Sequence, residues 1–159
     1  MTGFGRILEA LNEAGVRYVI VGGIAVIRHG VVRATRDIDA LVPAREIASA
    51  NVRGLMSALR ATRPDGSPHR EEDLSGRRTL HLHTAHGDLD LMPERDEPLS
   101  FDAVAARAQM RRVDGVSALV CSLADLVALK RIAGRERDLV DLSDLAAAHG
   151  TLPDSRESD

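Results

Sequence analysis

The feature that most constrains this chain is a short run in which two aspartates flank an isoleucine, Asp37-Ile38-Asp39. The run continues as an apolar segment to Val42 and stops at a proline, a pattern that predicts a strand. Because strand side chains alternate between faces, both carboxylates leave from one face while Ile38 enters the core on the other. Two like charges on one face repel each other, and solvent or a bound cation relieves that repulsion.

A second strand expected over residues 88–92 repeats this arrangement. Asp88 and Asp90 share one face, and Leu89 and Leu91 occupy the other. If the two strands are neighbours, one of these acids completes a cluster of three carboxylates. Mg²⁺ prefers such oxygen ligands and usually shares its shell with substrate phosphates. Two metals bridged by the cluster can activate an attacking hydroxyl and stabilise the leaving phosphate oxygen.

Two glycines, Gly22 and Gly23, follow a short strand predicted over residues 17–21 and precede a short helix predicted over residues 24–29. Glycine adopts backbone angles that other residues avoid and lets a phosphate approach backbone N–H groups closely. The start of a helix adds a favourable dipole for an anion. Such a pair alone is typical of an ordinary tight turn. Its position upstream of the two aspartates favours a phosphate-binding turn instead.

These segments together resemble the signature of the DNA-polymerase-β-like nucleotidyltransferase superfamily, a Gly-Gly or Gly-Ser turn followed by an Asp-hydrophobic-Asp strand. The form R-x-T-x-D-I-D over residues 33–39, with His29-Gly30 before it, resembles the AbiEii-type toxin branch and related small stand-alone members. Residues 87–92 resemble the third motif of that branch, and residues 129–142 resemble its C-terminal helical segment. The resemblance spans roughly residues 4–148.

The resemblance implies roles for single residues. In that superfamily the glycine turn holds a nucleoside triphosphate, and this role falls on Gly22 and Gly23. The first two acids bind metal ions and the third helps to activate the acceptor hydroxyl. The catalytic residues, which are also the metal ligands, are therefore expected to be Asp37, Asp39 and Asp90. The expected cofactor is Mg²⁺, with Mn²⁺ as an alternative.

The third motif places its carboxylate three residues after a glycine, and this selects Asp90 over Asp88. Asp88 departs from the family pattern, because it adds a carboxylate where the family varies. It is interpreted either as an acid that supports the metal ligands or as a solvated strand residue.

Three basic residues are candidates for contact with the triphosphate. Lys130 lies on a helix predicted from Ser122 to about Ile132, and it either contacts the phosphates or is a solvated residue of an amphipathic helix. For Arg33 and Arg36, contact with phosphate or acceptor competes with ion pairing to nearby acids, and we favour phosphate contact for Arg36. The nucleotide-binding residues expected here are thus the two glycines, Arg36 and Lys130.

Three histidines, His81, His83 and His86, invite a zinc interpretation. His81 and His83 share a strand face, but no cysteine is near and carboxylate chemistry with Mg²⁺ needs no histidine. A role in lining the substrate site or a plain surface position is favoured.

Two further acids, Asp138 and Asp141, lie three residues apart on the last predicted helix. They are interpreted as surface residues or as ion-pair partners of Arg135 or Arg137.

The remaining pattern predicts an α/β (α+β) fold with a small mixed β-sheet, packed helices and a C-terminal helical pair that closes one side of a cleft. A single nucleotidyltransferase domain is expected over residues 1–150, followed by a polar, disordered tail at 151–159. The other predicted elements are helices at 4–11, 44–61 and 101–108, a loop with or without a short edge strand at 62–78, a strand at 79–84, and a hairpin with its turn at 114–115.

The composition of the chain disfavours or excludes several classes of function. Aromatic residues make up only 2% of the chain, so binding by base stacking is disfavoured. The net charge is −3, so any contact with nucleic acid must be local. The single cysteine, Cys121, excludes an intrachain disulfide framework and a cysteine-based zinc site. No apolar run is long enough for a bilayer and no signal peptide is evident, so a cytoplasmic protein without a membrane partner is expected.

We therefore expect an enzyme of the nucleotidyltransferase class that moves a nucleoside monophosphate from an NTP to an acceptor hydroxyl. The resemblance implies tRNA or a protein as acceptor and a cognate toxin or antitoxin protein as partner, and further relatives adenylylate aminoglycosides. The alternative is a non-catalytic, nucleotidyltransferase-like antitoxin that acts by complex formation. Six arginines are candidates for a local basic patch that binds tRNA: Arg53, Arg60, Arg63, Arg70, Arg77 and Arg78.

Overall fold

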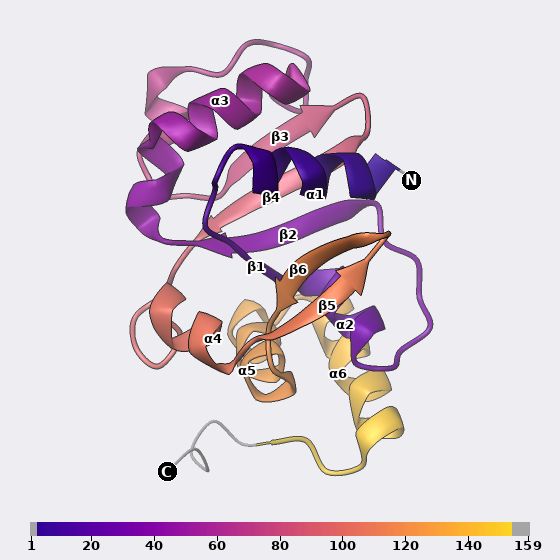
Figure 1. The fold of residues 1–159 in the computed structure, drawn as a ribbon. Coiled ribbons are helices and arrows are strands. Elements are labelled where there is room, and N and C mark those ends of the chain that lie inside the picture. Colours follow the sequence, from indigo (N-terminus) through magenta and orange to yellow (C-terminus); the bar gives the residue numbers. More distant parts are fainter. Residues whose placement is uncertain (1–2, 154–159) are drawn as a thin grey trace.

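The computed structural model of the protein describes residues 3–153. A six-stranded mixed sheet lies at its centre, with the strand order β3-β4-β2-β1-β6-β5 (Figure 1). The strands are β1 Val19–Val21, β2 Asp37–Val42, β3 Leu80–Thr84, β4 Gly87–Pro93, β5 Gln109–Val113 and β6 Val116–Val120. Strand β2 runs parallel to β4 and antiparallel to β1. The predicted neighbourhood of the two acidic strands is therefore confirmed.

Six α-helices and two short 3₁₀ segments surround this sheet. They are α1 Gly3–Glu13, α2 Gly22–Arg28, α3 Ala50–Leu59, α4 Phe101–Arg107, α5 Leu123–Ala133 and α6 Glu136–His149, with 3₁₀ turns at Ala44–Ala48 and Glu71–Leu74. Figure 1 shows α1 and α3 lying over the β2–β4 end of the sheet and α5 and α6 gathered near α2. The mixed α/β fold and its C-terminal helical pair are as predicted. None of the helices within residues 3–153 is long and apolar enough to cross a membrane.

Alternation along the central strands separates a core face from a polar face. Ile38, Leu89 and Leu91 are fully buried, whereas Asp39 and Asp90, which point the other way, are only partly buried. Helix α1 packs across β4 on the apolar side. The opposite side of the same strands is left for the acids, so burial of one face fixes the carboxylates on the other.

The prediction of one long helix over residues 44–61 is wrong for the first turns of that segment. A 3₁₀ segment occupies Ala44–Ala48, and the α-helix starts only at Ala50. Ser49 is extended, and its hydroxyl accepts a hydrogen bond of 3.2 Å from the N–H of Val52. Serine satisfies a free N–H group in this way at a helix start, so it begins a new helix instead of continuing the old one.

The segment 62–78 is mostly irregular, as expected, and contains a 3₁₀ turn at Glu71–Leu74. It forms no edge strand: a single bridge joins Thr62 to His83 of β3. The segment therefore lies against the outer strand of the sheet without extending it. The last residues of the chain, 154–159, to which most of the predicted tail belongs, lie outside the described part.

Candidate active site

Three carboxylates converge on the polar face of the sheet. Because β2 and β4 are parallel and in register, Asp39 lies opposite Asp90 and Asp37 lies opposite Asp88. One side-chain oxygen from each of Asp37, Asp39 and Asp90 lies within 4.8 Å of the others. The fourth acid takes a different partner: Asp88 is 53% exposed and its carboxylate is 2.6 Å from Nδ1 of His83. The structure thus brings together the three acids predicted as a cluster and leaves Asp88 outside it.

The carboxylates of the cluster repel one another electrostatically. Burial, and then the nearby charges of Asp37 and Asp90, raise the pKa of Asp39 from 3.8 to about 7. The ammonium group of Lys130 works in the opposite direction but does not cancel the effect. A carboxylate in this position is stabilised most directly by a cation placed among the three acids.

The chemistry of the donor set indicates which cation fits. Within residues 3–153, these three aspartates form the group of acidic, histidine or cysteine ligands close enough to share an ion. All of the donors are carboxylate oxygens, with no sulfur or imidazole among them. Mg²⁺ and Mn²⁺ favour such ligands, and zinc favours nitrogen and sulfur.

The glycine turn lies directly beside the acidic cluster. Strand β1 ends at Val21, opposite Asp39, so the chain turns at Gly22 directly beside that carboxylate. Gly22 has a positive φ of 66°, and a Cβ atom there would collide with the Asp39 carboxylate. Glycine is required at this position both for its backbone angle and for the close approach.

The second glycine meets a different neighbour. A Cβ atom on Gly23 would lie 2.8 Å from Oγ1 of Thr35 and 3.3 Å from a guanidinium nitrogen of Arg33. Thr35 in turn donates a hydrogen bond of 3.3 Å to the carboxylate of Asp37. The turn, the threonine and the first metal-ligand candidate are therefore in mutual contact. Thr35 is the threonine of the R-x-T-x-D-I-D pattern, to which the sequence analysis gave no role.

A cleft of about 140 Å³ lies between this polar face and the C-terminal helices. Its lining contains the glycine turn and the three acids on the sheet side. Four basic residues line it from the helices and from the segment before β2, namely Arg33, Lys130, Arg135 and Arg137. Acids that can hold a cation thus face bases that can hold an anion, an arrangement suited to a metal-bound polyphosphate.

Lys130 is held in the cleft wall by two buried acids. Its ammonium lies 3.0 Å from Asp138 and 2.8 Å from Asp141, and all three side chains are nearly inaccessible to solvent. The interpretation of Lys130 as a solvated residue is therefore wrong, and so is that of the two aspartates as surface residues. The helix faces that carry them meet where α5 packs on α6, which an amphipathic pattern alone does not reveal.

Two arginines extend this network toward the cleft. Arg33 donates two hydrogen bonds, of 2.5 and 2.6 Å, to Asp141, and Arg135 donates one of 2.8 Å to Asp138. Burial opposes ionisation of Asp138, but hydrogen bonds from Arg135 and Lys130 lower its pKa to about 2. The expected pairing of Asp138 with Arg135 is present. Arg137 lines the cleft and has no carboxylate partner in the described chain.

Arg36 is placed differently from the expectation. Its side chain is exposed and does not line the cleft, whereas that of Arg33 does. Arg36 directly precedes Asp37, and neighbouring residues of an extended chain point to opposite sides. Arg33 reaches the cleft because Asp141 holds its guanidinium.

His81 belongs to the edge of the same cleft. Its Nδ1 lies 2.7 Å from the carboxylate of Asp90, and the side chain lines the cavity together with Thr79 and Met92. His81 and His83 each face a different aspartate on β4, so the two imidazoles do not converge on one ion. This geometry agrees with the substrate-lining interpretation and gives no support to a zinc site.

Comparison with known proteins places this arrangement in a family. Residues 6–149 match the model of a family described as a nucleotidyltransferase of unknown function, DUF6036. A sequence search among curated proteins finds no match. The predicted resemblance to nucleotidyltransferases is thus confirmed at the level of the family.

Solved structures share the fold. The antibiotic-resistance factor ANT(2″)-Ia superposes with a TM-score of 0.60 at 15% identity, over 93% of this chain and 83% of that chain. The lincosamide antibiotic adenylyltransferase LnuA, solved with lincomycin bound, has a TM-score of 0.59 at 15% identity, over 92% of this chain and 96% of its own. At this identity the likeness establishes the common fold.

Proposed function

The chain belongs to the DUF6036 family of nucleotidyltransferases, and on this premise we propose that it is a Mg²⁺-dependent enzyme that transfers a nucleoside monophosphate from an NTP to an acceptor hydroxyl. The observation that carries the proposal is the convergence of Asp37, Asp39 and Asp90 within 4.8 Å beside the glycine turn. The two similar proteins named as antibiotic-resistance and antibiotic-modifying factors support nucleotidyl transfer as the reaction type.

The three carboxylates have separate tasks in this proposal. Asp37 and Asp39 hold Mg²⁺, with Mn²⁺ as a substitute, and Asp90 faces the acceptor and takes the proton from its hydroxyl. A bound divalent ion lowers the pKa of the acceptor hydroxyl and neutralises charge on the phosphates. The acceptor oxygen forms a bond to the α-phosphorus of the NTP. The bond from that phosphorus to the bridging oxygen breaks, and pyrophosphate leaves with the electron pair.

The basic wall of the cleft positions the triphosphate. Lys130 and Arg33 are fixed by buried acids, so their orientation costs little entropy when the nucleotide binds. Arg137 has no carboxylate partner within residues 3–153 and is free to contact phosphate directly. Gly22 and Gly23 let the phosphates approach the backbone beside the acids.

A transfer assay tests the proposal. The purified protein is incubated with Mg²⁺, each α-³²P-labelled NTP in turn, and cell lysate fractionated into RNA, protein and small molecules. Label in any fraction that is lost in the Asp39→Asn variant supports the enzyme. The matched control is Asp88→Asn, which removes an acid from the same face of the same sheet but outside the cluster.

Two results would count against this function. Labelling that persists in Asp39→Asn would show that it does not come from the cluster. Absence of both labelling and Mg²⁺-dependent NTP binding would favour the non-catalytic binding module. A role in a toxin–antitoxin system, with tRNA or a protein as acceptor, stays a prediction that the labelled fraction decides.

A further inference from the structure

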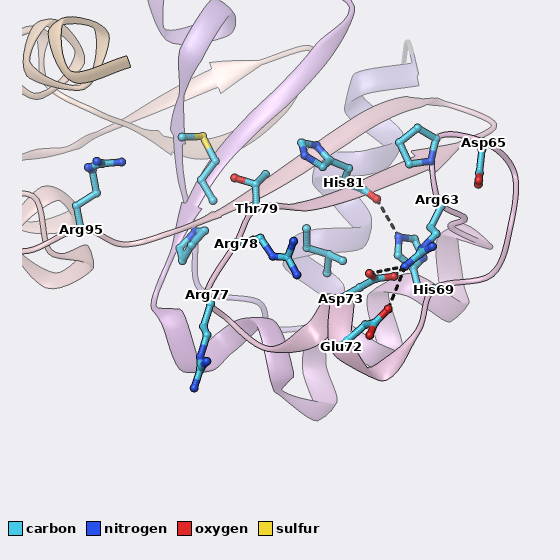
Figure 2. A pocket seen from close by; sticks show the side chains of 14 residues that line it. Arg63, Asp65, His69, Glu72, Asp73, Arg77, Arg78, Thr79, His81 and Arg95 are labelled. Atoms are coloured by element: carbon cyan, nitrogen blue, oxygen red, sulfur yellow. Dashed lines mark hydrogen bonds and ion pairs between the residues drawn. The ribbon is translucent and has the colours of Figure 1, made fainter. Parts of the chain in front are cut away.

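A second, larger cavity opens next to the cleft. It has a volume of about 850 Å³ and lies between the irregular segment 63–78 and the outer strands β3 and β4 (Figure 2). This volume falls in the range of cavities that bind small molecules. Thr79, His81 and Met92 line both cavities, so the two spaces adjoin at the side chain that touches Asp90. A molecule in the larger cavity can therefore present a hydroxyl to Asp90.

The acids in this cavity are already engaged. Arg63 binds Asp73 through two hydrogen bonds of 2.7 and 2.8 Å, and these bonds hold the pKa of Asp73 well below its usual range. Asp65 accepts hydrogen bonds from the backbone and hydroxyl of Ser67. Glu72 lies 3.6 Å from Arg70. Arg63 and Arg70 thus offset the charges of Asp73 and Glu72, whereas Asp65, whose partner Ser67 is uncharged, keeps its negative charge.

Three arginines of the lining have no such partner. Within residues 3–153, no carboxylate lies within ion-pair distance of Arg77, Arg78 or Arg95. Figure 2 shows the guanidinium of Arg78 between the Arg63–Asp73 pair on one side and Arg95 on the other. Uncompensated guanidinium groups beside a cavity favour an anion, and their planar donors match phosphate oxygens in pairs.

We propose that this cavity binds the acceptor, and that the acceptor is a small hydroxyl compound carrying a phosphate group attracted by the unpaired arginines of the lining, Arg78 and Arg95 among them. The inference rests on the proposed function and specifies its substrate class. The phosphate stays in the arginine-lined cavity, and a hydroxyl of the same molecule reaches Asp90 at the shared wall.

Charge and size separate this acceptor from two others. A cationic acceptor would meet three arginines without an acid partner and only one such acid, Asp65, in the described lining, which is unfavourable. Half of the basic patch predicted for tRNA is offset, because Arg53, Arg63 and Arg70 are paired with acids of the segment 71–73. Of the other three arginines, Arg77 and Arg78 line this one cavity, as suits a small anion, and Arg60 lies outside it.

Binding of simple probes to the full chain tests the inference. Ribose 5-phosphate and ribose are titrated by NMR, each with and without Mg²⁺ and saturating α,β-methylene ATP, an analogue that fills the nucleotide cleft without transfer. We expect ribose 5-phosphate to bind in both conditions and ribose to bind at least about tenfold more weakly, because charge-assisted hydrogen bonds to the phosphate are lost.

Two variants locate the site. The double change Arg78→Ala/Arg95→Ala should weaken ribose 5-phosphate binding about tenfold or more and leave the affinity for the ATP analogue unchanged. Arg112→Ala is the matched control, because Arg112 is an exposed arginine on β5, at the opposite edge of the sheet from β3. It should leave both affinities unchanged.

Specific results would overturn the inference. Equal binding of ribose and ribose 5-phosphate, or no effect of the double change, would show that the arginines of this cavity do not bind a phosphate group. Competition between ribose 5-phosphate and the ATP analogue would assign the arginines to the nucleotide instead. Arginine-dependent binding of a 5′-phosphorylated tetranucleotide RNA without binding of ribose 5-phosphate would favour a polynucleotide. If the ATP analogue itself fails to bind, the proposed function fails, and the titrations without nucleotide still decide whether the cavity binds phosphate.

Discussion

At the scale of single residues, the candidate site works against the stability of the metal-free protein. Asp39 is largely buried and lies beside two other carboxylates, and both effects raise its pKa to about 7. A group whose pKa is raised in the folded state binds its proton more tightly there than in the unfolded chain. Deprotonation therefore costs folding free energy, and this cost builds up as pH rises from the ordinary value near 3.8 through about 7.

The Asp39→Asn variant should accordingly be more stable than the wild type in EDTA at pH 8, by roughly 1–2 kcal/mol, and similar to it at pH 4. Mg²⁺ should raise the melting temperature of the wild type and leave that of the variant unchanged. Thermal unfolding at both pH values measures this. A variant less stable than the wild type at pH 8 would contradict the prediction.

The glycine turn allows an equally local test. Gly22→Ala should destabilise the protein by about 1–3 kcal/mol, because the residue has a positive φ and its new methyl group would collide with the Asp39 carboxylate. Gly54→Ala is the control: Gly54 lies within α3 and a Cβ atom there meets no other group within 4 Å. Chemical denaturation should find Gly54→Ala neutral or more stable by about 0.5–1 kcal/mol. Equal losses in the two variants would refute the argument from close contact.

At the scale of elements, the pairing of α5 with α6 depends on buried charge. Lys130 on α5 bridges Asp138 and Asp141 on α6, and these two acids also hold Arg135 and Arg33. A buried ion network of this kind adds little net stability compared with apolar packing. The network instead fixes the orientation of two basic side chains, Arg33 and Arg135, at the cleft.

Removing the centre of this network should be costly. Lys130→Met leaves two buried carboxylates with one cation fewer, and we expect a loss of about 3–5 kcal/mol in the free energy of unfolding. Arg53→Met, which breaks the exposed pair with Glu71, should cost less than about 1 kcal/mol. Urea denaturation of the two variants gives the comparison, and a loss below 1 kcal/mol for Lys130→Met would disprove the structural role assigned to the network.

At the scale of the whole molecule, the site is divided between two parts of the fold. The sheet supplies the acids and the glycine turn, and the C-terminal helices supply most of the bases. A metal-bound nucleotide that contacts both should couple their motions, because it binds the folded arrangement and not its opened forms.

Hydrogen exchange can detect this coupling. Adding Mg²⁺ and α,β-methylene ATP should slow amide exchange in α5 and α6 as well as in β2 and β4, and Asp39→Asn should show neither effect. The hairpin β5–β6 serves as an internal reference, because its outer strand β5 forms the far edge of the sheet. Protection confined to the sheet would mean that the helices do not contact the nucleotide.

The sequence by itself determined the features that depend on local pattern. Alternation placed Asp37 and Asp39 on one face and Ile38 in the core, and the glycines marked the turn beside them. The succession of strand and helix patterns was sufficient for the mixed α/β fold. Each of these features is set within a few residues, because side-chain direction and turn geometry are properties of the local backbone.

Only the tertiary structure decided which distant charges meet. Asp88 and Asp90 share a strand face and each contacts a histidine of β3, but of these two acids only Asp90 lies close enough to Asp37 and Asp39 to join the cluster. Likewise, Lys130 is buried because α6 brings Asp138 and Asp141 to it, and Arg33 enters the cleft in place of Arg36 because Asp141 holds it. Such pairings depend on strand register and helix packing between segments far apart in the chain, and no local pattern contains that information.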